Sequence, residues 1–221
     1  MSILGFHNDG GFAEYLPVPA NGCQKLCINT KPRSLSFEAA ALAEPLACCI
    51  NAQELSKIKL GDTVVIIGAG PLGHLHRQLA HISGASEVIL IENSPERIAF
   101  AKKVAPNYLI DPTEVDPVEA VKEITDGVDV VIPACSDPEV PAWGIEMLNK
   151  RGRIVFFSGL PHGYENSPID HNLIHYNELQ IFGAYGCTSE QNRKALKILA
   201  GRKIAVDELI TDHISLDELI K

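Results

Sequence analysis

The sequence lacks the features that mark a membrane protein or an exported protein. It has no uninterrupted run of about 18 apolar residues, which is the length that a membrane-spanning helix requires. Its first residues, MSILGFHNDGG, contain neither a basic region nor an apolar region of useful length, so we expect no signal peptide. We therefore predict a protein of the cytoplasm that does not insert into a membrane.

Positive charge is also scarce. Lys and Arg total 19 against 28 for Asp and Glu, which gives a formal net charge of −9 without any basic block. A surface of this sign repels the phosphates of nucleic acids and of anionic lipids, so we expect neither as a partner. The 221 residues, 46% hydrophobic and 21% charged, suffice for one large globular domain or for one domain plus part of another.

Cysteine is too sparse in a chain of this length and hydrophobicity to indicate a disulfide scaffold. Without an export signal, reduced thiols are the expectation. Two of the cysteines, Cys23 and Cys27, are four positions apart, unlike the C-x-x-C of a zinc knuckle, and we interpret them as ordinary thiols. The six cysteines are Cys23, Cys27, Cys48, Cys49, Cys135 and Cys187.

Between residues 60 and 185, short runs rich in Val and Ile alternate with amphipathic segments. Strands that are apolar throughout, alternating with helices, indicate a parallel sheet covered on both faces. The sequence therefore predicts an α/β protein with a doubly wound, six-stranded parallel sheet of the nucleotide-binding type. The predicted strands are 62–68, 87–92, 108–111, 128–134, 152–159 and 178–185. The predicted helices are 71–83, 94–105, 117–125, 140–149 and, after the last strand, 189–203.

The first 60 residues do not follow this alternation. The stretch 10–20, GGFAEYLPVPA, predicts an antiparallel strand and a turn, and 36–57 predicts helix. Pro45 is expected to break this helix, because the residue before a proline avoids the helical region and proline fits the first position of a new helix. Glu44 should therefore lie between two helices and project into a neighbouring cleft. At the other end of the chain, 208–221 predicts a further strand and helix.

The stretch GAGPLG matches the pattern G-x-G-x-x-G, and it follows a predicted strand and opens a predicted helix, as a dinucleotide-binding loop does. Its glycines, Gly68, Gly70 and Gly73, allow a tight turn, close approach of a pyrophosphate and close packing of helix on strand. Pro71 and Leu72 begin the helix, whose first amides favour phosphate. The sequence predicts a dinucleotide site here.

Glu92 ends the second predicted strand, about 20 residues after these glycines, where dinucleotide-binding folds carry an acidic residue. A carboxylate at this position accepts hydrogen bonds from the ribose hydroxyls and repels the 2′-phosphate of NADP. We therefore predict NAD as the cofactor. Arg97, at the start of the next helix, either contacts the adenine or the ribose or is a solvated helix residue.

Several segments together resemble the zinc-dependent medium-chain alcohol dehydrogenases. DGGFAEYLPVPA, SFEAAALAEPLA and LGDTVVIIGAGPLG occur in the order seen in that family, and GRIVFFSGLP, NLIHYNELQIFGAYG and ELITDHISLDELI extend the resemblance over essentially the whole chain. The chain is most similar to the polyol branch, the sorbitol or L-iditol dehydrogenases and relatives such as threonine dehydrogenase. The resemblance implies an oxidoreductase that uses NAD and zinc to oxidise a secondary alcohol of a polyol or sugar derivative to a ketone.

The resemblance also implies a division into domains. Residues 1–45 correspond to the end of a GroES-like, β-rich catalytic domain, 46–184 to the NAD-binding Rossmann domain, and 185–221 to part of the return to the catalytic domain. The chain thus resembles a family member that is truncated at both ends. The edge of the Rossmann sheet at 178–185 is the expected surface for a homo-oligomer.

Glu44, in EPL, matches the glutamate that lies at the catalytic zinc of the family, as a ligand or one water away. Zinc acts there as a Lewis acid on the alcohol oxygen. The other zinc ligands of the family, a cysteine and a Gly-His-Glu motif, precede the position aligned with Met1 and are absent from the 221 residues. Since a catalytic zinc normally has three protein ligands, the alternative is an inactive module that binds NAD. A zinc-free reductase of the quinone oxidoreductase type is a third reading, which Glu92 disfavours because those enzymes commonly use NADP.

The resemblance further implies that the nicotinamide passes Cys135, Gly159 and Leu160, at the ends of the fourth and fifth strands. Histidines are not expected to replace the missing zinc ligands. His171 and His175, one helical turn apart, lie in the connection before the last strand, away from the zinc of the family.

Overall fold

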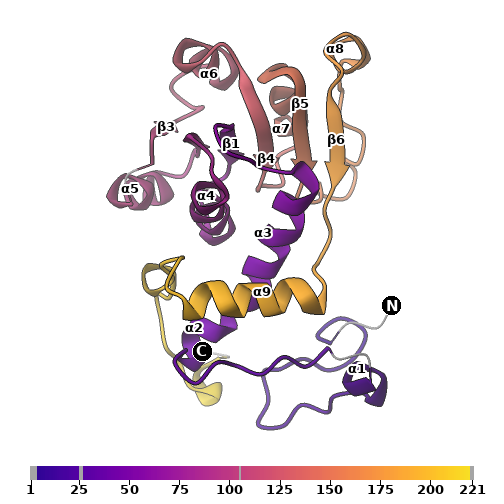
Figure 1. The fold of residues 1–221 in the computed structure, drawn as a ribbon, viewed down its shortest axis with the longest axis vertical. Helices are drawn as coiled ribbons and strands as arrows, with labels where there is room; N and C mark the ends of the chain where they lie inside the picture. The colour runs from indigo at the N-terminus through magenta and orange to yellow at the C-terminus, as the bar shows by residue number, and fades with distance from the viewer. Residues whose placement is uncertain (1–3, 25–26, 105, 220–221) are drawn as a thin grey trace.

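The computed structural model of the chain describes residues 4–24, 27–104 and 106–219 (Figure 1). Its centre is a six-stranded sheet in the order β3-β2-β1-β4-β5-β6, and all neighbouring strands are parallel. The predicted fold class is confirmed. The strands are β1 (Thr63–Ile67), β2 (Glu87–Ile91), β3 (Tyr108–Ile110), β4 (Val128–Pro133), β5 (Leu148–Phe156) and β6 (Gln180–Gly183).

Helices connect the strands and also flank the sheet at both ends of the chain. The helices are α1 (Ala20–Gln24), α2 (Phe37–Ala41), α3 (Ala43–Ser56), α4 (Pro71–Ser83), α5 (Pro95–Lys103), α6 (Pro117–Ile124), α7 (Val140–Glu146), α8 (His171–Tyr176) and α9 (Ser189–Ala200). Two short 3₁₀ helices, η1 (Asp207–Leu209) and η2 (Leu216–Glu218), follow α9. None of the helices in the described part of the chain is long and apolar enough to cross a membrane.

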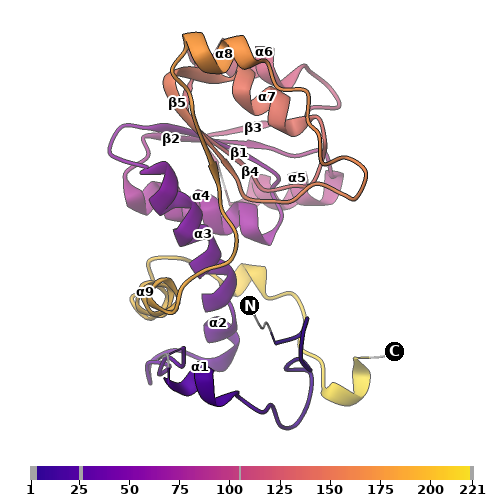
Figure 2. The same ribbon diagram turned by 90° about the vertical axis from the view of Figure 1, so that its right-hand side faces the viewer.

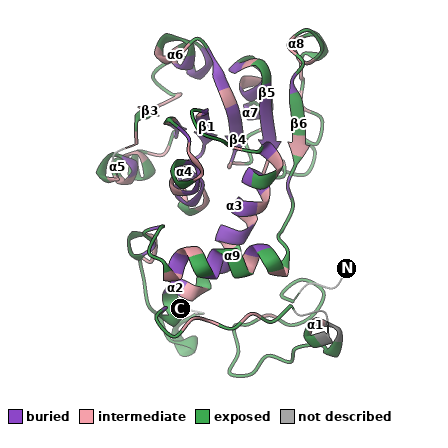
Figure 3. Ribbon diagram, viewed as in Figure 1, coloured by how far each residue is buried: buried purple, intermediate pink, exposed green. Residues whose placement is uncertain are grey.

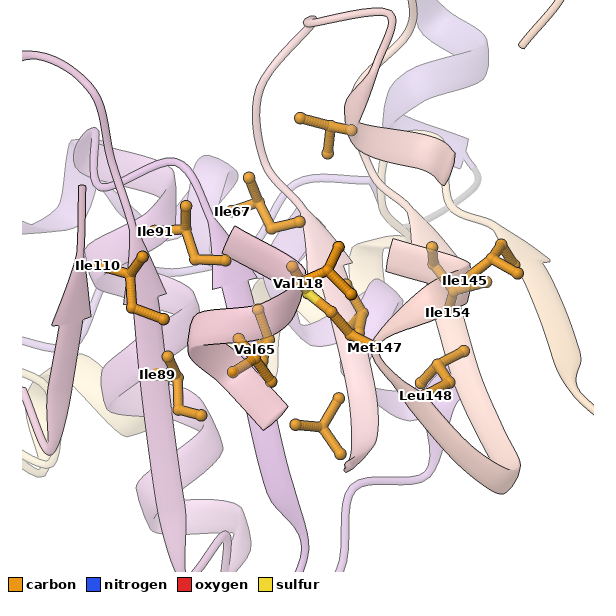
Figure 4. Packing of buried hydrophobic residues seen from close by; sticks show 14 of the residues in the cluster. Val65, Ile67, Ile89, Ile91, Ile110, Val118, Ile145, Met147, Leu148 and Ile154 are labelled. Carbon is orange, nitrogen blue, oxygen red and sulfur yellow. The ribbon is translucent and has the colours of Figure 1, made fainter. Parts of the chain in front are cut away.

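Both faces of the sheet are buried, because successive residues of a strand point to opposite sides. Val65 and Ile67 of β1 belong to an apolar cluster that includes residues of α6 and α7 (Figure 4). Val64 and Ile66, the alternate residues of the same strand, belong to a second cluster with residues of α4 and α5. Figure 2 shows the resulting three layers, with α6, α7 and α8 on one side of the sheet and α3, α4 and α5 on the other. The continuous apolar runs of the strands are thereby explained.

Helices α3, α4 and α9 form a third apolar cluster beside the sheet. Leu46 of α3 is fully buried there against residues of α4, such as Leu75, and of α9, such as Leu196. Helix α9 lies across α3, as Figure 1 shows, although more than 130 residues separate the two along the chain. This contact brings the connection between β6 and α9 onto the first turns of α3.

The junction between the first two predicted helices differs in detail from the prediction. The break lies at Leu42, between α2 and α3, whereas Glu44 and Pro45 are both in the first turn of α3. The prediction that Pro45 opens the second helix directly after Glu44 is wrong by two residues. Proline is tolerated at the third position because the first amides of a helix have no intrahelical partner to lose.

The expected strand over 10–20 is wrong. Residues 11–14 form bends and 15–19 have no regular structure, and the isolated bridge between Leu4 and Asn8 lies before this segment. A strand needs a hydrogen-bonded partner, and the six strands of the described chain pair only among themselves. Figure 3 shows that the segment is almost wholly exposed. The β-rich remnant implied by the resemblance is therefore not seen in the described residues.

Two further boundaries correct the prediction. Helix α7 ends at Glu146, not at 149, because Leu148 already pairs with Val128 on β4 and starts β5 earlier than expected. In 208–219, the expected strand is absent and η1 and η2 take its place, again without a partner strand.

Candidate functional site

The glycine-rich loop lies between β1 and α4, at the point where the chain order of the sheet reverses. Gly68 has φ +109°, and a Cβ atom there would lie 3.0 Å from the backbone oxygen of Ala134 at the end of β4. A Cβ atom on Gly73 would lie 1.9 Å from the backbone oxygen of Gly68. Both positions therefore exclude a side chain, one by backbone conformation and contact with β4, the other by close packing of α4 on the loop. Pro71 and Leu72 are the first residues of α4, which follows the loop directly.

Glu92 holds this loop to the end of β2. One carboxylate oxygen, Oε2, accepts a hydrogen bond from the Ala69 amide at 2.7 Å, and the other, Oε1, accepts from the amides of Asn93 and Ser94 at 3.0 and 2.9 Å. The residue is only 4% exposed. Glu92 was predicted to bind the ribose. The structure places it at the expected strand end but also gives it a structural contact that the sequence did not reveal.

Arg97 lies on the open side of the loop. Its Nη1 atom is 3.8 Å from Oε2 of Glu92, and its side chain is 58% exposed. A Cβ atom added to Gly70 would touch its guanidinium carbon at 3.7 Å. The positive charge of Arg97 thus stands next to the acidic residue that was expected to repel a 2′-phosphate, and it partly offsets that repulsion.

Two adjoining cavities follow the carboxyl ends of the strands. The smaller, about 100 Å³, is lined by Gly68, Glu92 and Arg97 among others, and the larger is about 430 Å³. Cys135 and Asp137, which follow β4, line both. The cavities therefore form one line across the switch point of the sheet, which is where doubly wound folds bind dinucleotides.

Only some of the residues expected along the nicotinamide path line these two cavities. Cys135 lines both cavities and Leu160 lines the larger one, but Gly159 lines neither and is exposed. Burial raises the pKa of the Cys135 thiol, so Cys135 contributes a neutral, weakly polar side chain to the lining of both cavities. Sequence reasoning missed Asp137 and Trp143, although their position just after a buried strand was a usable signal.

Glu44 was expected to project from a helix junction, and the structure places it, exposed, in the first turn of α3. One turn later on the same helix, Cys48 lies with its Sγ atom 3.4 Å from Oε1 of Glu44. Cys187, on the connection between β6 and α9, completes a group of three donor atoms that all lie within 4.8 Å of one another. The sequence carried one signal for this group, the spacing of Glu44 and Cys48 by four residues on a helix. The approach of Cys187 had no sequence signal.

Both thiols of the group are protonated at neutral pH in this structure. Burial, and then the charge of Glu44, raises the pKa of Cys48 to about 12. Burial and Glu44 also raise the pKa of Cys187. Because the thiolate is the reactive form, neither residue is an activated nucleophile. Two sulfurs and a carboxylate oxygen are, in contrast, ligand types that zinc accepts, so the donor set fits zinc.

The histidines lie elsewhere. His171 and His175 stack at 6.5 Å between ring centroids on α8, at the opposite side of the molecule from α2 and α9 (Figure 1). His74 and His76 are buried in α4, where burial lowers the pKa of His74 to about 4 and that of His76 to about 3. The only group of three or more metal-ligating side chains found among the described residues is that of Glu44.

Comparison with known proteins places this chain in a family. The profile of the zinc-binding dehydrogenase family matches residues 71–201. The chain is 37% identical over 212 residues to L-threonine 3-dehydrogenase of Pyrococcus horikoshii, covering 95% of this chain and 59% of that protein. It is 30% identical over 212 residues to sorbitol dehydrogenase of Bacillus subtilis, covering 95% and 58%.

Solved structures agree in fold. A protein of Sinorhizobium meliloti 1021, described as a zinc-binding dehydrogenase and bound to NADP, superposes with a TM-score of 0.89 at 35% identity, covering 98% of this chain and 63% of that one. The chain spans about three fifths of the length of these relatives. The family match covers more than half of the residues and agrees with the resemblance noted in the sequence. This chain therefore belongs to the zinc-binding dehydrogenase family.

Proposed function

We propose that the chain forms the dinucleotide-binding part of a dehydrogenase that uses NAD(P) and zinc to oxidise a secondary alcohol of a polyol or sugar derivative to a ketone. The observation that carries the proposal is the line of two cavities that begins at the glycine-rich loop and continues past Cys135 to Leu160. The names of the relatives support the substrate class, since threonine 3-dehydrogenase and sorbitol dehydrogenase are named for hydroxyl-bearing substrates.

In the proposed function, the residues of this chain bind and orient the dinucleotide. The first amides of α4 and the loop at Gly68 and Gly73 would bind the pyrophosphate. Cys135 and Leu160 would exclude water from the face of the nicotinamide on which a hydride is exchanged. Glu44 is the residue that the family resemblance assigns to zinc. When bound, zinc supplies a Lewis acid that polarises an alcohol oxygen.

The choice between NAD and NADP depends on Glu92 and Arg97. Of the roughly four lone-pair sites of the Glu92 carboxylate, three accept amides, which leaves one for a ribose hydroxyl. Arg97, exposed beside it, suits a 2′-phosphate. NAD remains our prediction because the carboxylate lies closer to the loop, and the NADP-bound relative makes Arg97 the residue to examine.

Calorimetric titration of the 221-residue chain with NAD⁺ and NADP⁺ tests the proposal. Both should bind, NAD⁺ more tightly, and Arg97→Ala should weaken NADP⁺ by more than it weakens NAD⁺. Gly73→Ala should abolish binding, because its methyl group would displace the loop. Gly11→Ala is the matched control, since a Cβ atom there meets nothing within 4 Å.

The outcomes separate the candidate functions. Reduction of NAD⁺ with a polyol supports the dehydrogenase. Dinucleotide binding without turnover, in the presence of zinc, supports the inactive binding module. Absence of binding by a folded chain overturns both. Mass measurement in solution tests the predicted homo-oligomer, for which the edge strand β6 is the proposed contact.

A further inference from the structure

We propose that Cys48 and Cys187 act together with Glu44 as the three protein ligands of a zinc site between α3 and the connection from β6 to α9. The inference rests on the proposed function for its choice of metal. It adds two ligands that the family resemblance does not supply, and it gives the exposed carboxylate of Glu44 a partner from within this chain.

The distances in the group fit a tetrahedral metal. Zinc binds thiolate sulfur at about 2.3 Å and carboxylate oxygen at about 2.1 Å, so tetrahedral angles separate a sulfur from an oxygen by about 3.6 Å and two sulfurs by about 3.8 Å. Sγ of Cys48 lies 3.4 Å from Oε1 of Glu44, and all three donor atoms lie within 4.8 Å of one another. The separation of Cys48 and Glu44 is therefore close to the tetrahedral value.

The backbone around Cys187 is held in place by α3. Gly186, directly before it, has φ +67°, a conformation that favours glycine, and its carbonyl oxygen accepts a hydrogen bond from the side chain of Asn51 at 3.0 Å. Asn51 is one turn beyond Cys48 on the same helix. The hydrogen bond therefore fixes Cys187 over the face of α3 that carries Glu44 and Cys48.

The residue that follows Cys187 is fixed as well. Thr188 caps α9, and its amide and the side chain of Gln191 form a capping box. The side-chain Nε2 atom of Gln191 in turn donates to Oδ1 of Asn51 at 3.1 Å and to Oε2 of Glu54 at 2.9 Å, both on α3. Cys187 thus lies between two anchored residues, so the thiol is brought to α3 by the fold and not by chance contact of a loose loop.

The site would keep one position open. Glu44 and Cys187 are exposed and Cys48 is half-buried, so solvent or a substrate oxygen can reach the metal. Three protein ligands with an open fourth position are the pattern of catalytic zinc. On binding, each thiol gives up its proton to solvent and the metal takes the two thiolates and the carboxylate, which leaves the loaded site with a net charge of −1.

Metal content and cobalt spectroscopy test the proposal without any turnover assay. The whole chain is purified with a non-chelating reductant, loaded with Zn²⁺ or Co²⁺, and freed of excess metal. We expect one zinc per chain, and with Co²⁺ a charge-transfer absorption of thiolate–cobalt bonds together with the intense visible bands of a tetrahedral site. Zinc should also raise the melting temperature, because it binds the folded chain only.

Three variants and one control define the ligands. Cys48→Ser, Cys187→Ser and Glu44→Gln should each weaken zinc binding by more than about 100-fold, since even groups that merely orient ligands contribute 10- to 100-fold. Cys23→Ser, which removes an exposed thiol elsewhere, should leave the zinc content and the cobalt spectrum unchanged. Circular dichroism of each variant shows whether the loss reflects unfolding, and Cys187→Ser, at an exposed position, is the variant least able to unfold the chain.

Two results would overturn the proposal. One is a folded wild-type chain that binds no zinc or that shows no thiolate–cobalt absorption. The other is a disulfide between Cys48 and Cys187 that persists in reductant and that zinc does not displace. NAD⁺ titration of the same samples keeps the two proposals apart: normal dinucleotide binding without zinc refutes only the metal site, and zinc binding without dinucleotide refutes only the proposed function.

Discussion

The sheet region, residues 63–183, and the N-terminal segment, residues 4–24 and 27–34, differ in where most of their large apolar side chains lie. In the sheet region, Val64, Val65 and Ile66 are fully buried on the two faces of one strand. In the N-terminal segment, Phe12 and Tyr15 are 85% and 88% exposed. Figure 3 shows the same division, with burial concentrated in the sheet and α3. Apolar residues therefore stabilise this chain only where a second layer covers them.

The difference in burial between the two regions indicates that the sheet region carries both the stability of the chain and the candidate site. The glycine-rich loop, Glu92 and the two cavities are all built on strand ends that both faces of the core hold in place. The N-terminal segment contacts α9 through the hydrogen bonds of Asn29 to Ser189 and Asn192. We expect stability to respond strongly to changes in the sheet region and weakly to changes in residues 4–19.

The largest effect is expected from the buried ion pair of Arg153 and Asp62. Arg153 on β5 donates to Asp62 at 2.8 Å and to the carbonyl oxygens of Ser56 and Lys57, both at 2.9 Å. Arg153→Met leaves the buried carboxylate unpaired and should lower the free energy of unfolding by roughly 3–5 kcal/mol in urea denaturation.

A matched control lies two residues earlier on the same strand. Arg151 pairs with Glu178 at 2.6 Å, but both side chains are largely exposed. Arg151→Met should therefore change the urea midpoint little. Equal losses for the two variants would mean that burial does not decide the strength of these pairs.

The next effect compares one buried and one exposed apolar residue. Leu46→Ala opens a cavity among α3, α4 and α9 and should cost about 2–5 kcal/mol of unfolding free energy. Phe12→Ala, in the N-terminal segment, should stay within about 0.5 kcal/mol. Thermal or urea unfolding of both variants checks this, and a large loss for Phe12→Ala would show that the N-terminal segment packs more tightly than its exposure indicates.

A smaller effect is expected from pH. Burial lowers the pKa of His76 to about 3, so the folded chain keeps it neutral while the unfolded chain takes up a proton below about pH 6.5. Stability should therefore fall as the pH drops from 6.5 towards 3, by about 2 kcal/mol at pH 5 for this residue. His76→Leu should lose that part of the pH dependence. Parallel stability curves for the variant and the wild type between pH 7 and 5 would refute it.

The parallel sheet and the glycine-rich loop at its edge could be predicted because they depend on local patterns. The strands β1 and β2 are nearly continuous apolar runs, and the glycines at Gly68 and Gly73 mark a loop that tolerates no side chain. The predicted strand over 10–20 is absent because its formation depends on more than the local pattern. Its residues are compatible with a strand, but a strand forms only when a second strand pairs with it. The local pattern does not show whether such a partner exists.

The finer features of the site depended on contacts between distant residues. That Glu92 accepts the amide of Ala69 follows from how the loop turns back over β2, and the acidic residue alone did not indicate it. Cys187 reaches Cys48 only because α9 packs on α3 through Gln191 and Asn51. A single sequence contains each of these residues but does not show that α3 and the connection before α9 contact each other.

Amide hydrogen exchange with and without NAD⁺ tests the central claim most directly, namely that the strand ends of the sheet region hold the dinucleotide. Saturating NAD⁺ should slow exchange in 66–74, 91–97 and 133–137, the segments around the glycine-rich loop and the two cavities. Exchange in 4–19 should not change. Slowing confined to the N-terminal segment, or unchanged exchange in 66–74 at saturation, would contradict the account.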